Sequence, residues 1–169
     1  MAARDKITLS AYAKSPVGSV LFLRHALAPG NGDPADFTLD DCASQRNLDA
    51  VGRRQAAVLG ALFRQHGIVF SRIYSSQWCR CLETAKLLKL GPVTDLPGLN
   101  SFYQGILPRE KTLDELRKVM SNLPDDGGLT LMVTHYVTIS AITGIGVASG
   151  EAVAFETAAG RAFKLDLTR

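Results

Sequence analysis

Long apolar runs and blocks of charge of one sign are both missing from this sequence. Its uninterrupted apolar stretches, such as residues 20–23, are far shorter than the roughly 20 residues that a transmembrane helix needs. Lys and Arg number 19 against 16 Asp and Glu, a net charge of +3, and no basic run is longer than a pair such as Arg53-Arg54. We therefore expect neither a membrane protein nor a protein that binds nucleic acid through a basic stripe.

The N-terminus lacks the apolar core of a secretory signal peptide. Residues 1–18 carry Arg4, Lys6 and Lys14 but no apolar stretch of about 7 to 15 residues. We expect them to be an N-terminal extension of one domain that spans residues 1–169, because a domain usually has about 100 to 200 residues. The compartment stays open: cytoplasmic by default, periplasmic if a native leader has been removed.

Cysteine is scarce, and the chain has only Cys42, Cys79 and Cys81. They match neither a CxxC pair nor a Cys/His zinc pattern, and an odd number leaves at most one disulfide. Two interpretations stay open: free thiols in a reducing cytosol, or an exported protein in which Cys42 pairs with Cys79 or Cys81. Because no cluster has the spacing of metal ligands, we expect no metal and no cofactor.

What the sequence does contain is an alternation of short apolar strands and amphipathic helices. Strands are predicted at residues 20–23, 68–74, 93–96 and 129–134, helices from 49 to near 67 and at 77–90, 112–123 and 137–142, and a hairpin at 152–167. This order is typical of an α/β domain. We expect a three-layer sandwich with a mostly parallel central sheet and helices on both faces.

Polar side chains mark two helix starts and one long loop. The Ser75 and Ser76 hydroxyls are expected to cap the helix at 77–90, and residues 112–115 form a capping-box pattern. Residues 28–47 show no periodicity. A loop of about 20 residues in a compact domain is usually functional or mobile.

Reactive or cationic side chains follow three of the predicted strands, at the point where each strand ends. They are Arg24 and His25, Ser76 with Arg80, and His135. The carboxyl ends of parallel strands are where ligands bind in open α/β sheets, so we expect these side chains to converge. Two guanidinium groups and a helix N-terminus suit a phosphoryl group, and a neutral imidazole can attack phosphorus.

The chain resembles the histidine phosphatase superfamily, also called phosphoglycerate-mutase-like, in four motifs that occur in the family's order. The motifs are Leu23-Arg24-His25-Ala26 against the family's Arg-His-Gly; Leu48 with Gly52 and Gln55-Ala56; Ser75-Ser76 through Arg80, Thr84 and Ala85; and Val133-Thr134-His135. The resemblance covers about residues 20–165. It implies that His25 is the phosphorylated nucleophile. It also implies that Arg24 and Arg80 hold the phosphate and that His135 stabilises the transferring group.

One departure from the family concerns the proton donor. Residues 99–105 resemble the family's Leu-x-Glu-x-x-x-Gly, but Ser101 stands at the Glu position, and Tyr136 rather than an Asp follows His135. A general acid contributes about 10² to 10⁴-fold. Either the leaving group departs readily, as from a phosphohistidine or an acyl phosphate, or the acid comes from the long loop. The candidates, called the loop aspartates below, are Asp33, Asp36, Asp40 and Asp41.

Other residues have two interpretations each. Arg46 is either a third cation beside the phosphate or the partner of Asp40 or Asp41 in a loop ion pair. Trp78 either contacts the substrate or packs in the core, and Ser76 is expected to bind phosphate. The contexts of Cys42 and of residues 78–81 resemble a bacterial subgroup of the family whose members often have an export leader, which favours a disulfide without choosing its partner.

These residues predict a metal-independent phosphohydrolase that acts on a phosphomonoester or a phosphoramidate through a phosphohistidine intermediate. The expected partner is a phosphorylated small molecule or a phosphohistidine-bearing protein. Two alternatives stay open. A non-catalytic phosphate-binding or regulatory module is compatible with Ser101, and a phosphoglycerate-mutase-type transfer is less favoured because the short chain has few insertions that could close over a site.

Overall fold

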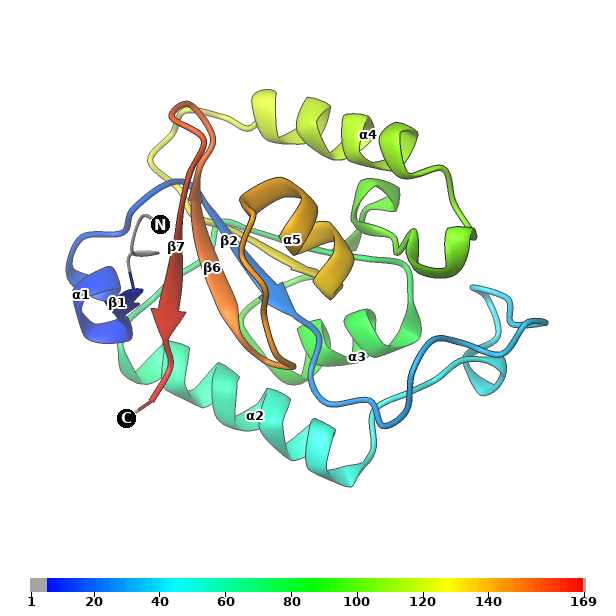
Figure 1. The fold of residues 1–169 in the computed structure, drawn as a ribbon. Helices are drawn as coiled ribbons and strands as arrows, with labels where there is room; N and C mark the ends of the chain where they lie inside the picture. Colours follow the sequence, from blue (N-terminus) through cyan, green and yellow to red (C-terminus); the bar gives the residue numbers. More distant parts are fainter. Residues whose placement is uncertain (1–5, 169) are drawn as a thin grey trace.

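The computed structural model describes residues 6–168, which fold around a seven-stranded sheet of order β1-β7-β6-β2-β5-β3-β4 (Figure 1). The strands are β1 Lys6–Thr8, β2 Val20–Arg24, β3 Arg72–Ser75, β4 Thr94–Asp95, β5 Thr130–Thr134, β6 Ala152–Glu156 and β7 Arg161–Asp166. The strands β2, β5, β3 and β4 run parallel, whereas β6 is antiparallel to both β2 and β7. The expected α/β fold with a mostly parallel sheet is confirmed.

Helices cover both faces of this sheet (Figure 1). They are α1 Leu9–Lys14, α2 Ala50–Gln65, α3 Cys79–Leu87, α4 Arg109–Ser121 and α5 Tyr136–Thr143, with short 3-10 helices η1 Cys42–Ser44, η2 Pro97–Leu99 and η3 Tyr103–Gly105. On β2, Leu21 and Leu23 pack with α1, α2 and α3, while Val20 and Phe22 pack with α4 and α5. Within residues 6–168, no helix combines the length and apolar character needed to cross a membrane.

The described part of the N-terminal segment belongs to the sheet. We predicted residues 1–18 to be an N-terminal extension of the domain; of these, β1 pairs in parallel with β7, and Leu9 and Tyr12 of α1 are buried. Thr8 caps α1 by accepting a hydrogen bond from Ala11 N at 3.2 Å. Three residues of strand and a short helix carry too little periodicity for a sequence pattern to detect.

Two helices begin at other residues than the cap patterns predicted. The helix α3 begins at Cys79 with Trp78 at its N-cap and no side-chain cap. Ser76 Oγ accepts from Trp78 N at 3.2 Å, one residue before the helix, and also binds His135, while Ser75 Oγ donates to Ser76 O. The helix α4 begins at Arg109, so Thr112 lies inside it and donates to Pro108 O at 2.9 Å. Residues 109–111 are Arg, Glu and Lys, which favour helix and extend it by a turn.

Candidate active site

The carboxyl ends of β2, β5 and β3 lie side by side, since β5 pairs in parallel with both neighbours. A backbone hydrogen bond from His25 N to Thr134 O, 3.0 Å long, continues the pairing beyond the end of β2. The imidazole rings of His25 and His135 come to lie with their centroids 5.5 Å apart, and both side chains are buried. The structure therefore brings together the histidines that the sequence placed at strand ends.

The segment that follows β2 is held by side chains from α2 and α3. Thr84 Oγ1 accepts from Ala26 N at 3.0 Å, and Gln55 Oε1 accepts from Leu27 N at 2.8 Å. A Cβ at Gly52 would lie 2.0 Å from Leu27 O, so α2 can approach this closely only with glycine there. These contacts give a structural reason for Gly52, Gln55 and Thr84, which belong to the second and third motifs of the resemblance: all three pack against the segment that carries the first motif.

His25 is held in one tautomer. Its Nδ1 lies 2.8 Å from Ala26 O, and because a carbonyl oxygen only accepts, Nδ1 carries the proton and Nε2 keeps its lone pair. Burial lowers the pKa of His25 to about 3; the Ala26 hydrogen bond opposes this shift, and the charges of Arg80 and Arg24 add to it. At neutral pH the imidazole is uncharged with a free nitrogen.

His135 is also uncharged, and Ser76 orients it. Burial, followed by the charges of His25 and Arg80, lowers the pKa of His135 well below its ordinary value. Its Nε2 lies 2.8 Å from Ser76 Oγ, and the same hydroxyl donates to Asn100 Oδ1 at 3.2 Å. The Ser76 hydroxyl, expected at the phosphate, thus binds His135 and Asn100 in this structure.

Arg80 is paired with one of the loop aspartates. Its Nη1 and Nη2 donate to Asp33 Oδ1 and Oδ2 at 2.8 and 3.1 Å, and both side chains are only 4% exposed. Burial alone would raise the pKa of Asp33, but hydrogen bonds from Arg80 and Arg46 N, with the Arg80 charge, lower it. An ionised carboxylate at neutral pH does not fit the proton donor that we considered, and Asp33 is instead the partner of Arg80.

The other three loop aspartates are exposed. Asp41 caps η1, with its Oδ1 accepting from Ala43 N at 3.0 Å. Within residues 6–168, neither Asp36 nor Asp40 nor Asp41 has a hydrogen bond or an ion pair to the histidines or arginines of the site. Ser101 is buried, and its Oγ accepts from Tyr103 N at 3.2 Å. The general acid therefore stays a prediction.

Two further arginines lie around His25. Arg24 donates to Val147 O at 2.8 Å, and its guanidinium stacks 5.6 Å from the centre of the Tyr136 ring. Arg46 donates to Gly32 O at 2.7 Å and to Ala28 O, so the predicted alternative of an ion pair with Asp40 or Asp41 is not found in the described chain. The charges of Arg24, Arg46 and Arg80 all lower the pKa of His25. We call Arg24, Arg46 and Arg80 the cationic cluster.

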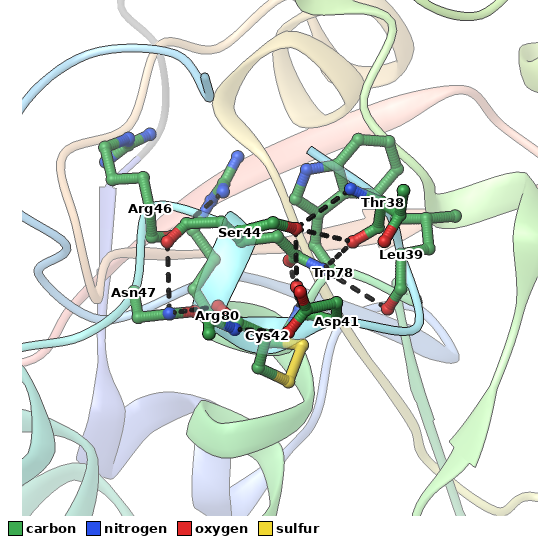
Figure 2. The surroundings of a disulfide bond; sticks show 12 residues. Thr38, Leu39, Asp41, Cys42, Ser44, Arg46, Asn47, Trp78 and Arg80 are labelled. Carbon is green, nitrogen blue, oxygen red and sulfur yellow. Dashed lines mark hydrogen bonds between the residues drawn. A yellow bond between two sulfur atoms is a disulfide. The ribbon is translucent and has the colours of Figure 1, made fainter. Parts of the chain in front are cut away.

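A disulfide joins the long loop to the start of α3. Cys42 bonds to Cys79 with the Cα atoms 5.7 Å apart, and Cys81 is a free, buried thiol. Figure 2 shows the loop residues around Cys42 beside Trp78 and Arg80. Of the two interpretations that the cysteine count left open, the structure thus contains the bridge, with Cys79 as the partner.

Trp78 packs at the centre of the site and also lines a cavity. It is 1% exposed, its ring stands edge-on to His135 with centroids 5.4 Å apart, and its Nε1 donates to Asp33 Oδ2 at 3.0 Å. A cavity of about 450 Å³ adjoins it, lined among others by Phe37, Leu39 and Ile106. The structure supports the packing interpretation and leaves a largely apolar space beyond the ring.

Sequence reasoning missed two buried amides that hold the site together. Gln45 Oε1 accepts from Cys79 N at 2.9 Å, and Asn100 Oδ1 accepts from Gln77 N at 2.8 Å. Gln45 carries no local signal. Asn100 precedes Ser101 inside the motif around the missing glutamate, so its position was a signal that could have drawn attention to it.

The arrangement can bind an anion and attack it. Three guanidinium groups and one carboxylate leave an excess of positive charge around an uncharged imidazole with a free Nε2. Arg24 Nε and Arg80 Nε are buried, and neither has a hydrogen-bond acceptor among residues 6–168. Buried donors are nearly always paired, so these two are available to a ligand oxygen. The described residues contain no group of three His, Cys, Asp or Glu that could hold a metal ion.

One family profile and several solved structures resemble this chain. The profile of the histidine phosphatase superfamily (branch 1) matches residues 20–125, whereas no curated protein sequence matches the chain significantly. Among solved structures, the protein histidine phosphatase SixA complexed with tungstate is 15% identical, covers 86% of this chain and 92% of its own, and has a TM-score of 0.57. Phosphoserine phosphatase from Entamoeba histolytica is 14% identical; the match covers 86% of this chain and 93% of that one, with a TM-score of 0.62. Phosphoglycerate mutase from Thermus thermophilus is 18% identical; the match covers 88% of this chain and 99% of that one, with a TM-score of 0.58. At such identities the structures share the fold with this chain, while the profile covers most of its length: the chain belongs to the histidine phosphatase superfamily, branch 1.

Proposed function

We propose that this protein is a metal-independent phosphohydrolase that works through a phosphohistidine at His25. The observation that carries the proposal is the tautomer of His25. Its Nδ1 proton is held by Ala26 O, which leaves the Nε2 lone pair among the arginines of the cationic cluster. A neutral nucleophile beside fixed cations is the combination that phosphoryl transfer requires.

The reaction takes two steps. In the first, His25 Nε2 attacks phosphorus in line with the leaving group, so that a P–N bond forms and the bond to the leaving group breaks. In the second, water attacks the phosphohistidine, which releases inorganic phosphate and restores the imidazole. Arg24 and Arg80 offset the charge on the phosphoryl oxygens in both transition states, because positioning and electrostatics supply most of the catalysis in phosphoryl transfer. His135 has the role that the family resemblance gives it, which is to stabilise the transferring group.

Ser101 narrows the substrate class. With a buried serine at the position of the family's glutamate, a leaving group that needs no proton is the easiest to expel. Phosphoramidates, including phosphohistidine on a partner protein, and aryl or acyl phosphates meet this condition. SixA is a protein histidine phosphatase, which supports testing a phosphohistidine-bearing protein beside small phosphorylated molecules.

Trapping the intermediate tests the proposal. After a short incubation with a phosphoramidate, we expect the protein to carry a labelled phosphoryl group that is acid-labile and alkali-stable. His25→Ala should lose both this label and turnover. His66→Asn is a matched control, because His66 ends α2 and its Nδ1 bonds to Leu62 O rather than to the site. Turnover by His25→Ala above about a hundredth of the wild-type rate would contradict the nucleophile role. A loss of label in a chelator that added metal restores would contradict the metal-free mechanism.

A non-catalytic phosphate-binding module is the second candidate, because Ser101 supplies no acid. Such a protein would bind inorganic phosphate or vanadate through the cationic cluster and yield neither label nor product. Binding without label across phosphoramidates, aryl phosphates and acyl phosphates would favour the module over the enzyme.

A further inference from the structure

The hydrogen bonds of Arg80 use only part of its guanidinium group. Nη1 donates to Asp33 Oδ1 at 2.8 Å and to Arg46 O at 3.2 Å, and Nη2 donates to Asp33 Oδ2 at 3.1 Å. A guanidinium has five N–H groups, so two are left: the Nε–H, which is buried with no acceptor in the part of the chain that the structure describes, and the second N–H of Nη2. These two lie on one edge of the group and form an intact fork.

We propose that Asp33 is a positioning residue that locks Arg80 with this Nε–Nη2 edge turned to the phosphoryl group of the substrate. The inference rests on the proposed function, since it concerns how the same site binds phosphate. Asp33 takes the end of the guanidinium and leaves the edge free, so the carboxylate and a phosphate bind Arg80 at the same time. Two parallel N–H bonds to one phosphate are stronger and more directional than a single contact.

Asp33 is itself fixed firmly enough to hold another side chain. Its two carboxylate oxygens accept four hydrogen bonds, two from Arg80, one from Arg46 N at 3.0 Å and one from Trp78 Nε1 at 3.0 Å. Its backbone N donates to Gln104 Oε1 at 3.1 Å. A carboxylate with all four acceptor sites in use has little freedom to rotate away.

The proposal predicts a result opposite in sign to simple electrostatics. Replacing Asp33 by Asn removes a negative charge from an anion site, and charge alone would then tighten phosphate binding. In the positioning role, the same change weakens binding, because Arg80 loses its bidentate partner and with it the fixed orientation of the Nε–Nη2 edge. Tighter phosphate binding in Asp33→Asn would also be expected if Asp33 occupied the position of the phosphate on Arg80, because phosphate would then have to displace it.

Calorimetric titration with inorganic phosphate at neutral pH separates these cases. We expect Asp33→Asn to raise the dissociation constant by about threefold or more, the loss of part of a charge-assisted contact. Asp125→Asn, which removes the same charge from an exposed turn after α4, should stay within about twofold. An unchanged or lower dissociation constant in Asp33→Asn overturns the inference. A wild-type protein that binds no phosphate removes the proposed function, and this inference with it.

The single tryptophan gives a second test that needs no variant. The indole N–H of Trp78 gives one NMR signal, and its exchange with solvent reports the hydrogen bond to Asp33. In the positioning role, saturation with inorganic phosphate leaves this N–H protected from exchange, because Asp33 keeps its place. Loss of protection on saturation would show that phosphate displaces Asp33, and would overturn the inference even if Asp33→Asn does not fold.

Discussion

Removing the Cys42–Cys79 disulfide should cost the protein a large part of its stability. The bridged cysteines are 37 residues apart, and for a closed loop of this length the chain-entropy relation gives about 4 kcal/mol. Measured losses are typically about 2 to 4 kcal/mol, against a total free energy of unfolding of about 5 to 15 kcal/mol for an ordinary domain. We therefore expect Cys42→Ser/Cys79→Ser to unfold at a clearly lower urea concentration than the wild type.

The local structure limits how far the loop is released. Gln45 still accepts from Cys79 N, and Asn47 Nδ2 still donates to Cys42 O at 2.6 Å, so the bonds beside the bridge survive the substitution. Urea unfolding followed by the fluorescence of the single tryptophan measures the loss, with and without a reducing agent. The reducing agent should lower the stability of the wild type alone. A decrease of less than about 1 kcal/mol in the free energy of unfolding, with the slope of this free energy against urea concentration unchanged, would refute the reasoning.

Four further predictions concern the site. Arg80→Ala leaves the buried Asp33 carboxylate with two of its four hydrogen bonds and should lower the free energy of unfolding by about 3 to 5 kcal/mol. Arg80→Ala/Asp33→Asn should then be more stable than Arg80→Ala in the same urea titration, and equal stability would show that the pair is not coupled. Because burial lowers the pKa of His25 to about 3, kcat/KM should fall on the acid side with a midpoint near pH 3. A loss centred near pH 6.5, measured with a substrate that does not itself ionise there, would mean that the imidazole is not desolvated. The folded-state pKa values of His25 and His135 are lowered, so the unfolded chain binds more protons below its own pKa of about 6.5, and stability should fall as pH drops from there; a urea midpoint that does not change from pH 7 to 5 would contradict this. Rates across a series of phosphate esters and phosphoramidates should rise steeply with leaving-group acidity, whereas a flat series that turns steep in an Asn variant of one exposed loop aspartate would identify that residue as the acid.

Much of the fold could be predicted, because its central elements carry strong local patterns. The apolar run at residues 20–23 predicted a strand buried on both faces, and β2 is that strand. Asp49 and the helical spacing after it predicted α2, whose N-cap is Asp49. The predicted starts of α3 and α4 were wrong for two reasons. Before α3, Ser76 Oγ binds His135 and Trp78 N, whereas before Thr112 the helix-favouring residues 109–111 lengthen α4 by a turn.

The site could be predicted only in its frame. Strand ends in a parallel sheet converge, so Arg24, His25 and His135 could be placed together by their positions after apolar runs. The pairing of Asp33 with Arg80 could not, because 47 residues separate them and the path of the aperiodic loop that carries Asp33 is set by tertiary contacts. The same holds for Gln45, a buried amide with no pattern around it.

Phosphate binding at the cationic cluster, as proposed above, would also couple folding to the supply of phosphate. Its three guanidinium groups face one carboxylate, and the like charges that remain repel one another in the free protein. An anion that binds only the folded chain relieves this repulsion and shifts the folding equilibrium by mass action, by about 2.7 kcal/mol at a hundred times its dissociation constant. If phosphate binds as proposed, the protein's resistance to heat and to proteases should rise with the concentration of free phosphate around it, and its abundance should fall where phosphate is scarce.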